Sequence, residues 1–377
     1  MASRFPPSSR HDEHDVPASA RVLIVDDSVV ARAVIARLID ASDHFSVAGA
    51  VGTAKAALEF LDRARVEFIL LDIEMPGVDG LTALPDLIAA GQGAKVLIVS
   101  SSTDEGGAAT VQALALGAAE TLVKPSAGAL SSRFGAALVA KLDRLCENPA
   151  RLPPSPIVRF SGLRAVVPQS AGVVKRGSDT PITAAGDYDV VAIGASTGGI
   201  HALNLMIREL PTGFRLPIVI TQHLPTSFMP YFAAQIALLA GRPCEVATDS
   251  LRIRPGRIII APGDAHLRCV ALGDGGAAFR LTQESVPSGC MPSVDPMLAS
   301  MAEVYGRRLL AIVLSGMGRD GAEGAQRVHE LGGCVIAQDQ ASSVVWGMPG
   351  AVAALGVADA VLPPDAIGRL VATRRRP

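Results

Sequence analysis

Residues 190–199 read VVAIGASTGG, an apolar run that passes directly into small and polar residues. The residues that follow, IHALNLMIREL, repeat apolar side chains at helical spacing. The stretch therefore predicts a buried strand, a tight turn and a helix. It contains the pattern G-x-S-x-G around Ser196, which is typical of a nucleophile elbow, where small neighbours leave a serine exposed on a strained turn. Glycine-rich turns of this kind also bind phosphates, so the motif alone leaves both interpretations open.

Two other interpretations of this turn fit less well. A dinucleotide-binding fingerprint needs the spacing G-x-G-x-x-G, which GASTGG lacks. A phosphate-binding P-loop needs Gly-Lys-Ser/Thr, and this half of the chain does not contain it. The serine elbow is the better prediction.

Similar apolar runs alternate with helical patterns along most of the chain. They lie at residues 22–25, 46–51, 68–73, 95–99, 120–123, 217–221, 257–260, 309–314 and 334–338. Near-continuous β-branched runs indicate strands that are covered on both faces, as in parallel sheets. The expected fold class is therefore α/β, with two doubly wound parallel-sheet domains.

A stretch rich in Pro, Ser and Gly separates the two sets of runs. It includes RLPPSP and VVPQSAGVVKRGSDTP and has no periodic apolar face. We therefore predict a disordered tail over 1–20, one domain over 21–145, a flexible linker over 146–186 and a second domain over 187–377.

Composition excludes several classes of protein. The 377 residues carry 34 Lys and Arg against 36 Asp and Glu, and only 4% are aromatic, so no nucleic-acid partner is expected. No apolar run approaches the roughly 18 residues of a spanning helix, and the first residues lack the apolar stretch of a secretory signal, so we expect no membrane insertion. Five scattered cysteines fit a reducing compartment, and we expect a cytoplasmic protein.

Polar residues follow the strands of the first domain at one edge of its predicted sheet. Asp26 and Asp27 follow the first strand, Asp72 the third, Ser100 ends the fourth and Lys124 follows the fifth. Three carboxylates at one edge repel one another unless a cation joins them, and their oxygen atoms favour Mg²⁺. Together these residues predict a phosphoryl site, with Asp72 as the nucleophile that becomes an aspartyl phosphate.

Residues 21–145 resemble the receiver domain of two-component response regulators. The resemblance is carried by VDDS, LLDIEMPGVDG and VKP. It implies a flavodoxin-like fold, phosphorylation of Asp72 by a histidine kinase, and Mg²⁺ bound with the help of Asp26 and Asp27. Receivers often carry an aromatic switch residue three positions before the lysine, whereas this chain has Thr121 there. The signal is then expected to travel through shifts of helices and loops.

A serine esterase also needs a base and a residue that orients it. His223 directly follows the strand PIVITQ, so it is expected at a carboxyl end beside Ser196, whereas His201 and His329 fall on predicted helices and His266 in a predicted loop. Asp320, in SGMGRDGA, follows another strand. Its competitors at similar positions are Asp264 and Asp339. We predict a Ser196, His223 and Asp320 set, which geometry rather than chain order defines.

Residues 187–377 resemble the catalytic domain of the chemotaxis protein-glutamate methylesterases (the CheB type). The matching stretches are IGASTGG, ITQHLP, IAPGDAH, PSVDPM, LSGMGRDGA and IAQDQASSVVWGMP. The resemblance implies a Rossmann-like catalytic domain with the triad above and backbone oxyanion donors near Thr197 and Met317. It also implies ester hydrolysis and glutamine deamidation on methyl-accepting chemoreceptors, a histidine kinase of the chemotaxis type as partner, a receiver that covers the cleft, and no cofactor for the ester chemistry.

Two other functions stay open. The second domain could bind a partner through an inactive esterase site, although all three triad residues are present. A receiver-linked transcription factor should have a basic helix-turn-helix output domain, whereas the predicted output domain is an α/β sheet whose only basic run is the terminal RRRP.

Overall fold

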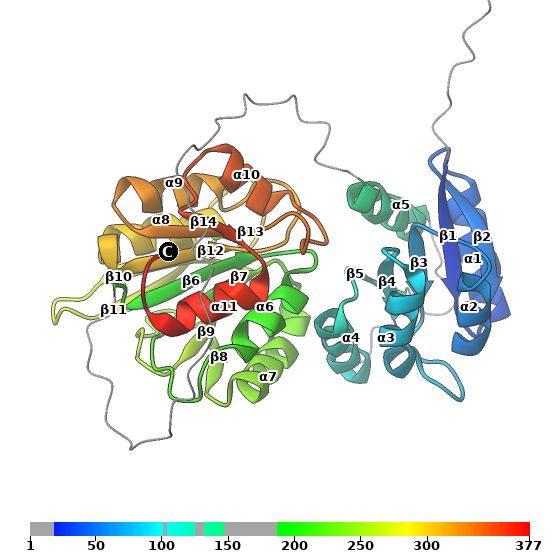
Figure 1. Ribbon diagram of the computed structural model, residues 1–377, viewed down its shortest axis with the longest axis horizontal. Helices are drawn as coiled ribbons and strands as arrows, with labels where there is room; N and C mark the ends of the chain where they lie inside the picture. The colour runs from blue at the N-terminus through cyan, green and yellow to red at the C-terminus, as the bar shows by residue number, and fades with distance from the viewer. Residues whose placement is uncertain (1–18, 101–103, 125–131, 147–186) are drawn as a thin grey trace, which may run out of the picture.

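The computed structural model describes residues 19–100, 104–124, 132–146 and 187–377 (Figure 1). The predicted tail and linker lie outside these residues, apart from their edges, and both stay predictions. Within the described residues, no helix is long and apolar enough to cross a membrane.

The N-terminal sheet has the strand order β2-β1-β3-β4-β5, with all neighbours parallel. This is the flavodoxin-like order, so the predicted fold of this domain is confirmed. Its strands are β1 (Ala20–Val25), β2 (Phe45–Val51), β3 (Phe68–Leu71), β4 (Lys95–Ser100) and β5 (Glu120–Val123). Its helices are α1 (Val29–Asp40), α2 (Ala54–Leu61), α3 (Gly80–Gly91), α4 (Asp104–Leu116) and α5 (Ser132–Cys146).

Local sequence signals set the starts of three of these helices. The side chains of Ser28, Thr53 and Asp79 each accept a hydrogen bond from a backbone N–H in the first turn of α1, α2 and α3. Such caps satisfy donors that have no partner within the helix. The three helices follow the carboxyl ends of β1, β2 and β3.

The C-terminal sheet has seven parallel strands in the order β14-β13-β12-β6-β7-β9-β8. They are β6 (Val190–Ala195), β7 (Ile218–Gln222), β8 (Cys244–Val246), β9 (Ile258–Ile260), β12 (Leu309–Val313), β13 (Cys334–Gln338) and β14 (Ala360–Leu362). The helices are α6 (Gly199–Arg208), α7 (Met229–Ala240), α8 (Val294–Tyr305), α9 (Ala322–Glu330), α10 (Met348–Ala354) and α11 (Pro364–Thr373). The predicted doubly wound architecture is confirmed.

Some elements were not predicted. The edge strands β8 and β14 have three residues each, and none of these residues is buried, unlike those of the equally short β9. An antiparallel hairpin, β10 (His266–Ala271) and β11 (Ala277–Thr282), packs against α8. The prediction that His266 lies in a loop is therefore wrong: it begins β10 and is fully buried. Leu267, Cys269 and Phe279 draw the hairpin onto the core because they bury apolar surface there.

The chain reverses its winding direction at β6. This strand pairs with β7 on one side and with β12, which comes much later in the chain, on the other. In doubly wound sheets a crevice opens at such a switch point, beyond the carboxyl ends of the strands. Ser196, His223 and Asp320 all follow these three strands, which places them around one crevice.

The two domains touch where helix α4 packs against α6 and α7 (Figure 1). The N–H of Gly198 donates to the carbonyl of Ala119 at 3.2 Å, and a ring nitrogen of His201 lies 3.0 Å from the carbonyl of Ala115. One buried apolar cluster contains residues of both domains. The N-terminal domain thus contacts the turn that carries Ser196.

Candidate active site

The turn at Ser196 depends on close approach between backbones. Ser196 follows β6 directly, and its N–H donates to the carbonyl of Ser315 at 3.0 Å. Gly198 has a φ of +74°, and a Cβ placed there would lie 2.5 Å from Cβ of Val344. A Cβ on Gly316 would lie 2.8 Å from Cβ of Ser196. Only glycine fits these two positions, which explains the small residues around the serine.

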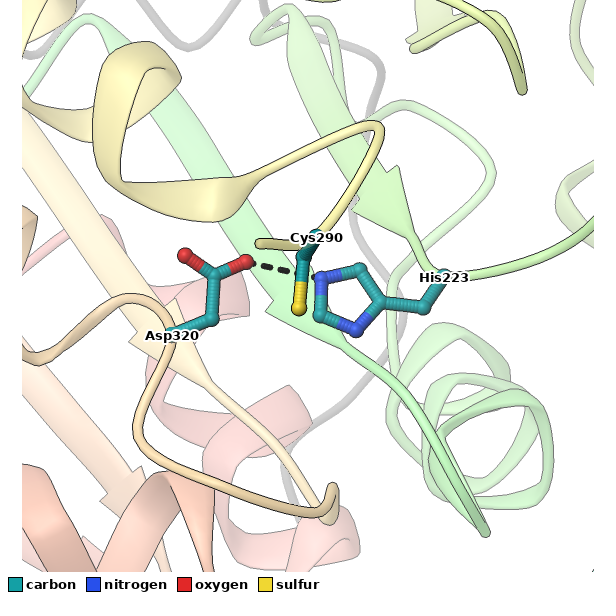
Figure 2. Close-up of side chains that lie close together, drawn as sticks. All are labelled: His223, Cys290 and Asp320. Carbon is teal, nitrogen blue, oxygen red and sulfur yellow. Dashed lines mark hydrogen bonds and ion pairs between the residues drawn. The ribbon is translucent and has the colours of Figure 1, made fainter. Parts of the chain in front are cut away.

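His223 and Asp320 are in direct contact. Nε2 of His223 lies 2.7 Å from Oδ2 of Asp320, and the carboxylate is almost fully buried (Figure 2). Ser196 and His223 contribute to the same small cavity. Among the described residues, none forms a hydrogen bond with the Ser196 hydroxyl, so Ser196 and His223 are not hydrogen-bonded to each other in this structure. Catalytic hydrogen bonds often tighten only when substrate is bound.

Asp320 is held by donors from the start of helix α8. Oδ1 accepts from the Ser293 hydroxyl at 2.6 Å and from the N–H of Asp295 at 3.3 Å, and Oδ2 accepts from the N–H of Val294 at 2.8 Å. These bonds fix the carboxylate and leave Oδ2 directed at His223. The sequence analysis missed Ser293 as a partner, although the quoted stretch PSVDPM contains it.

The pair shifts the pKa of each partner. Burial lowers the pKa of the His223 imidazole, but the hydrogen bond to Asp320 and the nearby Cys290 side chain outweigh burial and raise the pKa to about 9. Burial raises the pKa of Asp320, but its hydrogen bonds to His223 and Ser293 outweigh this and hold the pKa well below its ordinary value. Asp320 is therefore ionised at neutral pH and stabilises a positive imidazole.

The competing residues make other contacts. Asp339 accepts from the backbone and hydroxyl of Ser342, and Asp264 is exposed. The two ring nitrogens of His266 lie near the N–H of Ser293 and the carbonyl of Glu284. His266 therefore contacts Ser293, which in turn donates to Asp320.

Thr197 and Met317 both lie at the border between the domains. The Thr197 hydroxyl donates to Oε2 of Glu120 at 3.1 Å, and Met317 packs against a buried apolar cluster that joins residues of the N-terminal domain with Val345. Their suggested role as oxyanion donors stays a prediction.

The cavity beside Ser196 is very small. Its volume is about 20 Å³, and its walls come from both domains, including Leu114, Ala118 and Glu120 from the N-terminal one. This is room for about one water molecule. Both domains therefore line the space beside the Ser196 turn.

The predicted acidic pocket is assembled at the carboxyl edge of the N-terminal sheet. Asp26, Asp27 and Asp72 each have a carboxylate oxygen within 4.8 Å of the others. Nζ of Lys124 lies 2.8 Å from Asp26 and 2.6 Å from Asp72. Burial raises the pKa of Asp72, against the opposing effect of Lys124. Oxygen atoms alone form this cluster, which fits the preference of Mg²⁺.

Ser100, predicted to support the phosphoryl site, and Thr121, at the usual position of the aromatic switch, are both buried near this pocket. The Ser100 hydroxyl is buried and lies 2.9 Å from the Thr110 hydroxyl, so here it contacts helix α4 rather than Asp72. Thr121 is also buried, and its N–H donates to Oε1 of the neighbouring Glu120. Glu120 in turn reaches Thr197, so the usual switch position is adjacent to a residue that contacts the serine turn.

Comparisons with known proteins agree with both halves of the structure. Residues 191–371 match the CheB methylesterase family, and residues 22–133 match the response regulator receiver domain. A protein-glutamate methylesterase/protein-glutamine glutaminase of Paramagnetospirillum magneticum is 41% identical, covering 92% of this chain and 93% of that protein. One of Caulobacter vibrioides is 40% identical, covering 94% and 99%. The chain belongs to the protein-glutamate methylesterase/protein-glutamine glutaminase family.

Both domains of this methylesterase family member also resemble solved structures. The catalytic domain of a Thermotoga maritima CheB methylesterase is 38% identical, with a TM-score of 0.48, and the match covers 49% of this chain and 98% of that chain. The response regulator domain of Thermotoga maritima CheB is 36% identical, with a TM-score of 0.30, over 33% and 95%. We refer below to the receiver and the methylesterase domain.

Proposed function

We propose that this protein is a phosphorylation-activated methylesterase that hydrolyses glutamate methyl esters on chemoreceptors, with Ser196, His223 and Asp320 as its catalytic residues. The observation that carries the proposal is the bond of 2.7 Å between His223 and a buried Asp320, on the same rim as the Ser196 turn. Family membership supports the same reaction. The substrate is then a receptor in the cytoplasm, and the phosphodonor is a histidine kinase of the chemotaxis type.

The bond between His223 and Asp320 supports a definite order of proton transfers in this proposal. Asp320 holds Nε2 of His223, so Nδ1 is the nitrogen left to accept the proton of Ser196. The serine oxygen attacks the ester carbonyl, and backbone N–H groups near Thr197 and Met317 stabilise the oxyanion. His223 then protonates the leaving oxygen, and methanol departs. Water, deprotonated by His223, cleaves the acyl-enzyme and leaves a glutamate carboxylate.

The same steps apply to a glutamine side chain. In that case His223 protonates nitrogen, and ammonia leaves instead of methanol. Both reactions leave a negative charge on the receptor helix. Like charges repel at neighbouring helical positions, so each event can shift the receptor between its signalling states.

In the receiver, Asp26, Asp27 and Asp72 would hold Mg²⁺, and Asp72 would accept the phosphoryl group. When bound, the ion supplies positive charge that screens the carboxylates from the incoming phosphoryl oxygens. Lys124 already contacts Asp26 and Asp72 and would pair with a phosphoryl oxygen. Ser100 would need to leave Thr110 to donate a hydrogen bond there.

The receiver acts as a cover in this proposal. Its residues line the cavity of about 20 Å³ beside Ser196, and the Thr197 hydroxyl donates to Glu120 next to the nucleophile. Ser100 and Thr110 join the phosphoryl edge to α4, which is the helix seated on α6 and α7. Phosphorylation that moves α4 would therefore weaken the packing of the receiver against α6 and α7, and substrate could then reach Ser196.

Phosphorylation is expected to raise the rate of methanol release by about tenfold or more, since coupling between sites is typically 1–3 kcal/mol. A small phosphodonor such as acetyl phosphate, added with Mg²⁺, should produce this increase in the wild-type chain. Asp72→Asn should not respond, whereas Asp86→Asn, an exposed change on α3, should respond like the wild type. An equal increase in Asp72→Asn would remove Asp72 from the switch.

The pH profile of hydrolysis should report the raised pKa of His223. The base must be neutral, and a group with a pKa of about 9 is mostly protonated at pH 7. We therefore expect kcat/KM to rise roughly tenfold per pH unit above pH 7 and to level off near the pKa. The measurement needs a chelator in the buffer and subtraction of spontaneous ester hydrolysis. A plateau reached by pH 6.5 would contradict the raised pKa.

The proposed function is tested by incubating the full chain with chemoreceptor membranes that carry labelled methyl groups. Methanol should appear in the volatile fraction, faster after phosphodonor is added. If no methanol appears either without or with the phosphodonor, the result would favour the alternative, a receiver joined to an inactive binding domain.

A further inference from the structure

A third side chain lies beside the catalytic pair and takes no part in the proton transfers. Cys290 comes from the loop that precedes α8, and its sulfur points toward His223 and Asp320 (Figure 2). One ligand atom of each of these three residues lies within 4.8 Å of the others. The three residues come from loops after β7, before α8 and after β12, so only the fold brings them together.

The donor atoms of this cluster differ in kind from those of the receiver pocket. Cys290 offers sulfur, His223 nitrogen and Asp320 oxygen, whereas the receiver pocket offers oxygen only. Mixed sulfur and nitrogen donors suit Zn²⁺, and three protein ligands with an open fourth position form a known type of zinc site. Mg²⁺ and Ca²⁺ prefer oxygen throughout, so the two clusters select different ions.

The surroundings also fit a metal site. The Ser293 hydroxyl and the N–H of Val294 orient the Asp320 carboxylate, as outer partners of metal ligands commonly do. The Cys290 thiol lies 3.7 Å from the carbonyl of Ser288, a weak contact that a metal bond would replace. Cys290 and His223 are both partly exposed, which leaves an approach from solvent.

We propose that Cys290, His223 and Asp320 form a binding site for Zn²⁺, and that occupation of this site stops hydrolysis. Tetrahedral zinc places its ligands about 3.4 Å apart, so the contact of 2.7 Å between His223 and Asp320 must open slightly. The Cys290 thiol loses its proton to solvent on binding, and a ring nitrogen of His223 becomes a ligand instead of a base. The inhibition rests on the proposed function, whereas the binding does not.

The binding is tested on the full chain with Co²⁺ as a spectroscopic stand-in for Zn²⁺, in excess Mg²⁺ to occupy the receiver pocket. A thiolate-to-cobalt charge-transfer band at one metal per chain is expected. Cys290→Ser and Cys290→Ala should lose the band and bind Zn²⁺ at least tenfold more weakly. Cys146→Ser, which changes an exposed cysteine on α5, should keep both properties. A band that persists without Cys290, or is absent from the wild type, overturns the site.

Two further measurements separate binding from catalysis. Zn²⁺ should protect Cys290 of the wild type from alkylation, as read by peptide mass spectrometry, and this result needs no variant. Zn²⁺ should also reduce the rate of methanol release of the wild type at least tenfold, with the effect reversed by chelator and lost in Cys290→Ser. Equal inhibition of Cys290→Ser would overturn the inhibitory role. A chain that releases no methanol without zinc would refute the proposed function instead, and the cobalt result would still decide the metal site.

Discussion

Replacement of Ser196 by alanine is expected to lower the rate of methanol release by about 10⁴-fold or more. Loss of the nucleophile from a serine triad removes the covalent route and leaves only binding and oxyanion stabilisation. Stability should change little, because the Ser196 hydroxyl makes no hydrogen bond to any other described residue. Initial rates on labelled receptor membranes and a thermal melt of the same preparation measure both effects.

Ser285→Ala is a matched control for that change. Ser285 is an exposed serine of the methylesterase domain, on the segment after β11. It should retain wild-type turnover and the same melting temperature. Turnover by Ser196→Ala within tenfold of the wild type would assign the nucleophile elsewhere, and a large fall in melting temperature would show that the serine also supports the fold.

Asp320→Asn is expected to lower kcat by about 10³- to 10⁴-fold while the chain stays folded. The amide can keep its oxygen at the Oδ2 position, where Val294 and His223 donate, and place its nitrogen at Oδ1, where the Ser293 hydroxyl can turn to accept. Only the N–H of Asp295, which donates to Oδ1 over a long 3.3 Å, then loses its acceptor. The loss is therefore mainly of negative charge. Without it, the pKa of His223 should fall from about 9 toward its ordinary value.

The histidine titration distinguishes this role from a merely structural one. The pKa of His223 can be followed by NMR of labelled histidine in metal-free buffer, together with kcat at each pH. Asp264→Asn removes a similarly placed but exposed carboxylate and should leave both quantities unchanged. If Asp320→Asn leaves the pKa of His223 where it was, Asp320 does not stabilise the imidazole charge.

Much of the fold is already present in local sequence patterns. The apolar runs at 22–25 and 190–193 become central strands, and the small residues around Ser196 become the tight turn that follows β6. A strand covered on both faces needs a continuous apolar run, so its pattern is strong. Three-residue edge strands such as β8 and the hairpin that begins at His266 lack such a pattern, because their burial comes from packing against other elements.

The candidate site likewise has a part that local sequence patterns predict and a part that depends on packing. The sequence by itself determined the residue types and their positions after strands: Ser196 after β6, His223 after β7 and Asp320 after β12, because a parallel sheet collects these ends at one edge. Only the tertiary structure decided which carboxylate among Asp264, Asp320 and Asp339 reaches the imidazole. It alone placed Cys290 beside the pair and the receiver over the serine turn, since contacts between distant loops and domains depend on packing in three dimensions, which no local pattern encodes.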